Sequence, residues 1–198
     1  MRIPAAVAVL AWFLGSAGAQ VQHWSETPNE TIWRTRYTNC DKGYAVDLPA
    51  GVVAHDSLPP NPNHGFLIST SNPGTTTEVT LENQRIIDVY DEYNAMEFSS
   101  ARAFLRWDLK QIPNKEVLQV RDVMFQGLRA VEARYRVNAG DSSEVTEKLV
   151  IFRKPADLIY VLFLRTTRQH HSADSALFAR IRAGFHLLPI PKGACLNQ

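Results

Sequence analysis

The chain has 198 residues, of which 45% are hydrophobic and 21% charged, and this length and composition are typical of one globular domain with a sizeable core. Its formal net charge is +1, so it lacks the excess of positive charge that a nucleic-acid-binding protein or a polybasic membrane-surface protein uses.

The first nineteen residues have the three parts of a secretory signal peptide. Arg2 supplies a positive charge, residues 5–14 form an unbroken apolar run, and Ala17-Gly18-Ala19 is a small-residue cleavage pattern. The run is shorter than the roughly 20 apolar residues of a membrane-spanning helix, which favours cleavage over an uncleaved anchor. We therefore expect cleavage near Ala19/Gln20 and a secreted or periplasmic protein without a stable membrane span.

After the signal, residues 20–39 are polar and without periodicity, and we expect an N-terminal arm ahead of a single domain over residues 40–198. The chain has two cysteines, Cys40 and Cys195, at opposite ends of that domain. An even pair in an exported protein favours a disulfide, although two unpaired thiols are the alternative. Such a bridge stabilises the fold by at most ~5 kcal/mol in the chain-entropy model.

The first half of the domain contains strand patterns separated by turns. Tyr44, Val46 and Leu48 alternate in a strand that Pro49 stops, and a proline-rich loop over 57–65 leads to a strand over 66–70. Residues 76–90 are rich in β-branched side chains and predict one bent strand or two short ones. Three acids that follow closely, Asp88, Asp91 and Glu92, are expected in a solvated turn rather than as a catalytic carboxylate pair.

The second half predicts a helix, four strands and a final helix. Ser99 is the expected N-cap of a helix whose apolar face includes Ala101, Phe104, Leu105 and Leu109 and which Pro113 ends. Strands are predicted over 117–125, 128–137, 145–152 and 158–166, with Val131, Ala133, Tyr135 and Val137 on one face of the second against Glu132, Arg134 and Arg136 on the other. The last helix is expected over 173–183, with Gly184 just after it.

Short turns between these strands favour hairpins, and hence an α+β fold in which helices pack on an antiparallel β-sheet. The opening segment Gly43-Tyr44-Ala45-Val46-Asp47-Leu48-Pro49 resembles the first strand of the Mog1/PsbP-like superfamily. The turn at 125–128, the apolar strand from Leu158 and the terminal helix ending at Gly184-Phe185 are also similar to it, so the resemblance covers about residues 43–187. It implies a Mog1/PsbP-like α/β sandwich that acts mostly as an accessory or binding protein.

One group of residues has the chemistry of metal ligands. His55, Asp56 and His64 flank the proline-rich loop, and histidine and carboxylate side chains bind zinc. A metal-binding protein or metal-dependent hydrolase is therefore the alternative function, against a solvated loop without a ligand. Three ligands are the minimum for a zinc site, so this alternative depends on how the fold places them.

No nucleophile motif, cofactor fingerprint or glycine-rich phosphate loop occurs in the sequence, and we expect no catalytic residue and no cofactor. Large aromatic side chains in predicted loops or off the apolar helix face can anchor a partner. The candidates for partner binding are Trp33, Tyr90, Tyr93 and Trp107. The sequence thus favours a non-catalytic accessory protein of the cell envelope or extracellular space, with an unknown protein or small molecule as its partner and no nucleic acid.

Overall fold

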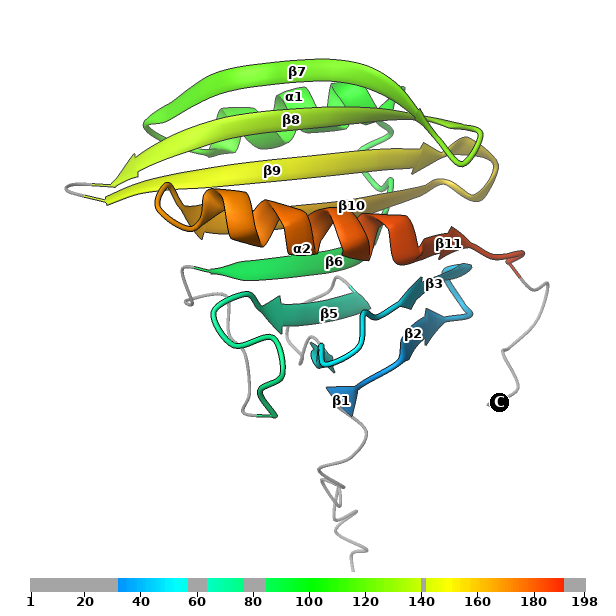
Figure 1. The fold of residues 1–198 in the computed structure, drawn as a ribbon. Coiled ribbons are helices and arrows are strands. Elements are labelled where there is room, and N and C mark those ends of the chain that lie inside the picture. Colours follow the sequence, from blue (N-terminus) through cyan, green and yellow to red (C-terminus); the bar gives the residue numbers. More distant parts are fainter. Residues whose placement is uncertain (1–31, 57–63, 77–84, 140–141, 191–198) are drawn as a thin grey trace, which may run out of the picture.

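The computed structural model describes residues 32–56, 64–76, 85–139 and 142–190. Within them, one large antiparallel sheet has eight strands (Figure 1). From edge to edge these are β1 (Ile32–Trp33), β4 (Ala54–Asp56), β5 (His64–Ser69), β6 (Ile86–Tyr93), β10 (Leu158–Thr167), β9 (Ser142–Arg153), β8 (Leu128–Ala139) and β7 (Lys115–Phe125). A smaller sheet contains β11 (Phe185–Leu187), β3 (Tyr44–Asp47) and β2 (Arg36–Asn39).

Two helices lie on opposite faces of the large sheet. Successive side chains of a strand point to opposite faces, so the same strands supply apolar side chains to both helices. Helix α1 (Ala101–Gln111) packs behind the sheet in the view of Figure 1, and α2 (His171–Gly184) lies in front with the small sheet. Each side has its own hydrophobic core. The α1 side includes Phe104, Leu105, Leu109, Val131, Val150, Ile159 and Val161, and the α2 side includes Tyr44, Phe66, Val89, Leu149, Tyr160, Leu162, Phe178 and Ile181.

The expected antiparallel sheet with helices packed on it is confirmed, and the four long strands from β7 to β10 lie where the sequence predicts them. Three boundaries differ. Ser100, not Ser99, caps α1 by accepting a hydrogen bond from the Ala103 amide at 3.2 Å. Helix α2 begins at His171 and still includes Gly184. The region expected to form strands over 76–90 contributes β6 from Ile86, and residues 77–84 lie outside the described residues.

Four short strands were not predicted, and two of them lie in the expected arm. Residues 32–33 form β1, which pairs with β4, and residues 36–39 form β2, which pairs with β3. Tyr37 on β2 is buried, with its ring 4.8 Å from that of Phe66 and 5.2 Å from that of Trp33 between centroids. Strands of two to four residues are too short to display an alternating pattern, so pairing and not periodicity defines them.

The described C-terminal end lies beside the turn that follows Cys40. The Leu188 amide donates to the Gly43 carbonyl at 2.8 Å, and Arg153 Nη1 donates to the carbonyl oxygens of both Gly43 and Leu188. Gly43 has a φ of +66° inside this contact.

The connection between β9 and β10 is formed by a 3₁₀ turn, Lys154–Ala156.

We predict that Gly43→Ala destabilises the protein by ~2–4 kcal/mol, since it combines left-handed backbone strain with overpacking. A Cβ at this position would lie 2.5 Å from Ile190 Cγ1 and 2.9 Å from the Leu188 oxygen. Gly51→Ala is the matched control, because Gly51 has a φ of +78° with no atom within 4 Å of the added Cβ. Its cost is expected to stay at ~1 kcal/mol. Equal losses of unfolding free energy in urea would contradict the packing role of Gly43.

Cys195 lies outside the described residues, so its disulfide with Cys40 stays a prediction. The position of Leu188 beside Gly43 supports it, because the five residues that follow Ile190, up to Cys195, can span up to ~17 Å. Intact mass after alkylation should therefore show no labelled thiol without reductant and two labelled thiols after reduction. Labelling of both cysteines in the non-reduced, unfolded protein would refute the bridge.

A candidate binding surface on strands β7 to β9

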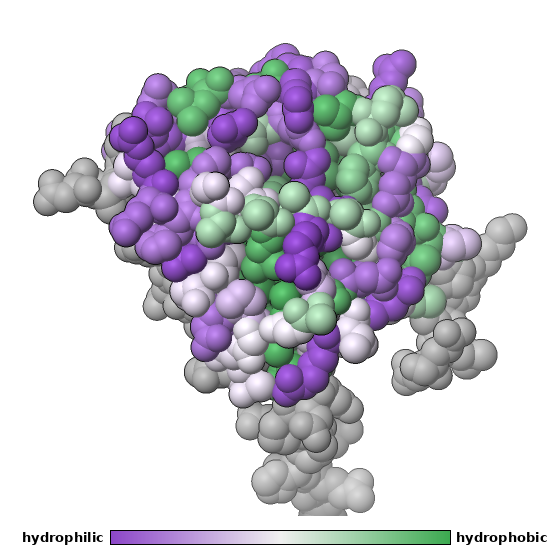
Figure 2. Space-filling model, in the orientation of Figure 1, coloured by the Kyte–Doolittle hydropathy of each residue, from purple (hydrophilic) through white to green (hydrophobic). Residues whose placement is uncertain are grey.

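Helix α2 leaves part of its own face of the large sheet uncovered. It packs over β10, with Phe178 and Ile181 buried, while the strands β7, β8 and β9 lie beyond it in the view of Figure 1. In the view of Figure 2 the surface over these three strands is mainly hydrophilic. We call this region the open face. It consists of Glu116, Gln119, Arg121, Glu132, Arg134, Arg136 and Glu147, with Arg182 of α2 at its border.

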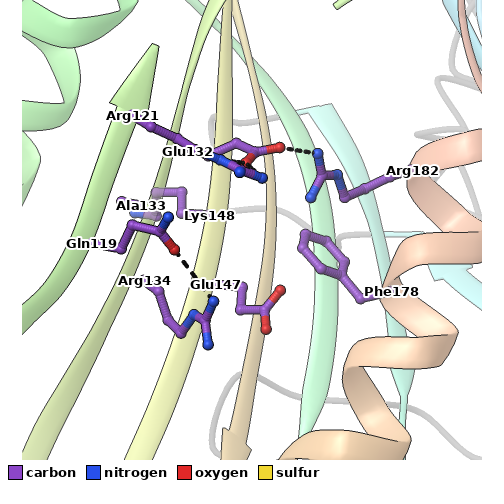
Figure 3. Close-up of a pocket in the computed structure, with 9 residues that line it drawn as sticks. All are labelled: Gln119, Arg121, Glu132, Ala133, Arg134, Glu147, Lys148, Phe178 and Arg182. Atoms are coloured by element: carbon purple, nitrogen blue, oxygen red, sulfur yellow. Dashed lines mark hydrogen bonds and ion pairs between the residues drawn. The ribbon is translucent and has the colours of Figure 1, made fainter. Parts of the chain in front are cut away.

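Glu132 holds two arginines of the open face in place, in the upper part of the view in Figure 3. Its carboxylate accepts hydrogen bonds from Arg121 at 2.6 Å on one side and from Arg182 on the other (Figure 3). Burial acts to raise the pKa of Glu132, but the hydrogen bonds from Arg182 and Arg121 outweigh it and hold the pKa below its usual value. The Glu132 side chain is 15% exposed and that of Arg121 is 60% exposed. A mostly buried acid therefore supports an arginine that reaches into solvent.

The lower part of the open face distributes charge differently. Arg134 Nη2 donates to the neutral amide oxygen of Gln119 at 3.2 Å. Across the sheet, Glu147 accepts from Ser175 at 3.0 Å and lies 2.7 Å from His171 Nε2, both on α2. Arg134 and Glu147 are cross-strand neighbours, yet the described contacts of Glu147 go toward α2. The guanidinium of Arg134 is thus left on the surface with a neutral partner.

A cavity of about 80 Å³ lies among these side chains, beside Phe178 (Figure 3). This volume corresponds to two or three water molecules, at ~30 Å³ each, and is far below that of a typical organic-ligand pocket. The open face is therefore suited to a flat, charged partner surface rather than to an enclosed substrate. Arginines held in a fixed orientation recognise carboxylates by paired hydrogen bonds.

The residues expected as metal ligands occupy β4 and β5. His55 and Asp56 are adjacent on β4, so their side chains point to opposite faces of the strand. His55 is buried and its Nε2 lies 3.1 Å from the Thr75 carbonyl oxygen. The side chain of His64 is not among the described ones, and the described residues contain no group of three His, Cys, Asp or Glu side chains suited to a metal. The metal site stays a prediction.

The four aromatic candidates lie apart. Tyr90 is buried on the α1 side against Phe163, and Trp107, 37% exposed, packs on Phe98 and Phe104. On the other side, Trp33 packs on Tyr37, and Tyr93 is 66% exposed with Lys42 Nζ 3.5 Å from its ring centroid. The structure does not join these four residues into one surface. A role in partner binding stays a prediction for them.

The open face was not among the predicted sites, although its signal was present. The alternation of Glu132, Arg134 and Arg136 opposite an apolar row defines a polar face of β8. The predicted hairpin of strands 117–125 and 128–137 also places Arg121 opposite Glu132, but the sequence could not indicate that α2 would bring Arg182 to the other side of Glu132.

The solvated turn expected around Asp88, Asp91 and Glu92 is wrong, because all three belong to β6. Asp88 and Asp91 are 3% and 1% exposed and lie on opposite faces of the sheet. Burial raises the pKa of each to about 7, against the opposing effect of Lys148 and Arg165 on Asp88 and of Lys42 on Asp91. Asn39 Nδ2 donates to Asp91 at 3.2 Å, and Lys42 Nζ lies 3.8 Å from its other oxygen.

These raised pKa values predict that stability falls as the pH rises. The folded protein holds a proton on Asp88 and Asp91 more tightly than the unfolded chain does, so the stabilisation is complete below about pH 4 and lost as the pH approaches about 7. Asp88→Asn, which keeps the shape without the charge, should raise the unfolding free energy at about pH 8 by ~1–3 kcal/mol. Asp122→Asn is the control, because Asp122 is exposed beside Arg102. Urea unfolding at several pH values measures both, and a fall in stability of Asp88→Asn at about pH 8 would contradict the burial of a charged Asp88.

No family model matches the chain, and no curated protein matches it in sequence. Solved structures match it in fold. Cyanobacterial PsbP (CyanoP) from Synechocystis is 17% identical with a TM-score of 0.52, over 79% of this chain and 92% of that one. LpqN of Mycobacterium tuberculosis, described as involved in cell envelope biogenesis, is 11% identical with a TM-score of 0.56, over 80% and 92%. The Ran-binding protein Mog1p of Saccharomyces cerevisiae is 15% identical with a TM-score of 0.50, over 79% and 96%.

Among the described residues, no helix has the length and apolar character needed to cross a membrane. The eight-stranded antiparallel sheet with helices on it and these structural matches together identify the fold: the chain has the Mog1/PsbP-like α+β fold.

Proposed function

We propose that the protein is an exported, non-catalytic accessory protein that binds an acidic protein partner through its open face. The observation that carries this proposal is the pair of arginines on that face. Arg121 is fixed through Nε and Nη2 by the mostly buried Glu132, which leaves its Nη1 on an exposed side chain, and Arg134 has a neutral hydrogen-bond partner, so both can donate to carboxylates of a partner. Because these groups are oriented before binding, less conformational entropy is lost when a partner docks.

The edge position of β7 supports the same surface. Gln119 and Arg121 lie on β7, one of the two edge strands that the structure describes in the large sheet, and both side chains are exposed. A partner can therefore approach the open face from above the sheet and past its edge. Charged side chains at the exposed edge of an interface mainly accelerate association and select the partner. Because salt screens their interactions, binding should weaken as the salt concentration increases.

Export and an accessory role are supported by the sequence and by two proteins of the same fold. The signal pattern at residues 1–19 favours a location outside the cytoplasm. LpqN is described as involved in cell envelope biogenesis and Mog1p as a Ran-binding protein, so this fold hosts a protein of the envelope and a protein-binding one. The fold alone does not determine the partner, and the proposed site rests on the arginines.

The test is chemical cross-linking in the cells that produce the protein, followed by purification of the full chain and mass spectrometry. The double variant Arg121→Glu/Arg134→Glu reverses two exposed charges of the open face. It should reduce the recovered partner by about tenfold or more, since each weakened ion pair of ~1.4 kcal/mol corresponds to a factor of ten. The mass of the mature chain, expected to begin at Gln20, tests export in the same sample.

The matched control is Arg106→Glu/Lys110→Glu, which reverses two exposed charges on α1, on the opposite face of the sheet. This variant should retain the partner. Equal loss in both double variants, or no loss in either, would contradict the assignment to the open face. Circular dichroism of each variant verifies that the fold is intact.

A further inference from the structure

A second cavity lies on the other side of α2, away from the open face. It measures about 370 Å³ and opens to solvent between α2 and two loops, one at residues 50–52 and one at 70–74. This volume lies near the lower end of the range for small-molecule sites. Its apolar walls include Val52, Pro73 and Leu177, and its polar side chains are Thr70, Arg85, Asp174 and Arg180.

Arg85 is held firmly at this cavity. Its Nε and Nη2 donate to the two oxygens of Asp174 at 2.9 and 2.7 Å, and Nη2 also donates to the Thr70 carbonyl at 3.3 Å. The Asp174 side chain is 3% exposed and accepts a further hydrogen bond from Thr166. Burial acts to raise the pKa of Asp174, but Arg85, Thr166 and the nearby Thr70 hydroxyl outweigh it and lower the pKa, so the pair is ionised. The described bonds of Arg85 leave its Nη1 available on a side chain that is 22% exposed.

A buried hydroxyl lies in the same cavity without a hydrogen bond of good geometry. Thr70 is 6% exposed and lies near enough to the Asp174 carboxylate to help lower its pKa, but its Oγ1 makes no hydrogen bond of good geometry within the described part of the chain. An unsatisfied buried polar group costs free energy, so it indicates a missing partner such as a ligand atom or an ordered water.

The charges of the lining do not cancel. The charge of Asp174 is balanced by Arg85. Arg180 lies six residues further along α2, is exposed, and adds a positive charge to the lining. One anionic group therefore restores neutrality, and the free Nη1 of Arg85 together with Arg180 provides donors for it. The apolar walls leave room for a short aliphatic body beside that group.

We propose that this cavity binds a small carboxylate with a short branched aliphatic body, either a free acid or the C-terminal residue of a peptide. The carboxylate contacts Arg85 Nη1 and Arg180, the Thr70 hydroxyl donates a hydrogen bond to it, and the aliphatic part packs on Val52 and Leu177. This site is separate from the open face, and its test does not depend on the protein partner.

The experiment is an NMR titration of the full mature protein with three probes: isovalerate, N-acetyl-glycyl-valine with a free C-terminus, and the same dipeptide as its C-terminal amide. We expect saturable shifts of amides at 50–52, 70–74 and 173–180 with at least one of the two carboxylate probes, and binding weaker by about tenfold or more for the amide. Saturation by isovalerate identifies a free acid as sufficient, and saturation by the dipeptide alone identifies a peptide terminus.

Two variants localise the binding. Arg180→Glu, a substitution at an exposed position, should weaken binding of the carboxylate probe by about tenfold or more. Thr70→Val removes the buried hydroxyl with little change in volume and should weaken binding by a smaller factor. Arg106→Glu on α1 should leave binding unchanged. Absence of saturable shifts with every carboxylate, equal binding of the amide, or binding unaffected by Arg180→Glu would each overturn the proposal.

Discussion

The size of one helix relative to the large sheet determines much of this molecule. An α-helix with its side chains is ~10 Å wide and covers about two strands that are ~4.8 Å apart. Helix α2 covers the region of β10, and the small sheet packs in the same core. Parts of the strands β7, β8 and β9 extend beyond both, so the side chains of those parts on that face must be compatible with water, whereas Ala130, Leu149 and Ile151 are buried in the core. The open face is the result.

That constraint gives the charged residues of the open face their structural role. Apolar side chains there would form an exposed patch on an edge strand, which favours aggregation. Cross-strand ion pairs satisfy the same positions, as between Arg136 and Glu116 at 2.8 Å. Exposed pairs of this kind contribute little to stability, typically ~0–1 kcal/mol. Their arrangement is therefore better explained by solubility and recognition than by stability.

The two cavities beside α2 differ for the same geometric reason. On the side of β9 the helix meets a strand directly, and the remaining space among charged side chains is about 80 Å³. On the opposite side the helix faces loops at 50–52 and 70–74, which leave about 370 Å³. A single helix thus separates a flat surface suited to a protein from a recess suited to a small molecule.

The sequence predicted the parts of the fold that have long periodic patterns. The alternation along 128–137 and the apolar spacing from Ala101 to Leu109 identify β8 and α1 because each pattern repeats several times. Strands such as β1 and β4 are too short for this and depend on partners distant in the chain. A similar limit hides part of the candidate site: Arg121 and Glu132 face each other in the β7–β8 hairpin, but Arg182 is distant in sequence, and only the packing of α2 brings it to Glu132.

Buried acids are the clearest case in which local sequence is misleading. Asp88 and Asp91 interrupt an apolar segment and suggest a turn, yet β6 is central in the sheet and carries them into its two cores. Tertiary pairing of β6 with β5 and β10 outweighs the polar character of the two side chains.

The central claim is that a partner docks on the open face. Hydrogen–deuterium exchange of the purified complex tests it most directly, because β7 is an edge strand of the described sheet and part of its backbone amides point away from β8. The account predicts slower exchange over residues 115–125 in the complex than in the isolated protein, with exchange over 99–112 unchanged. Slower exchange confined to α1, or no change in β7, would contradict it.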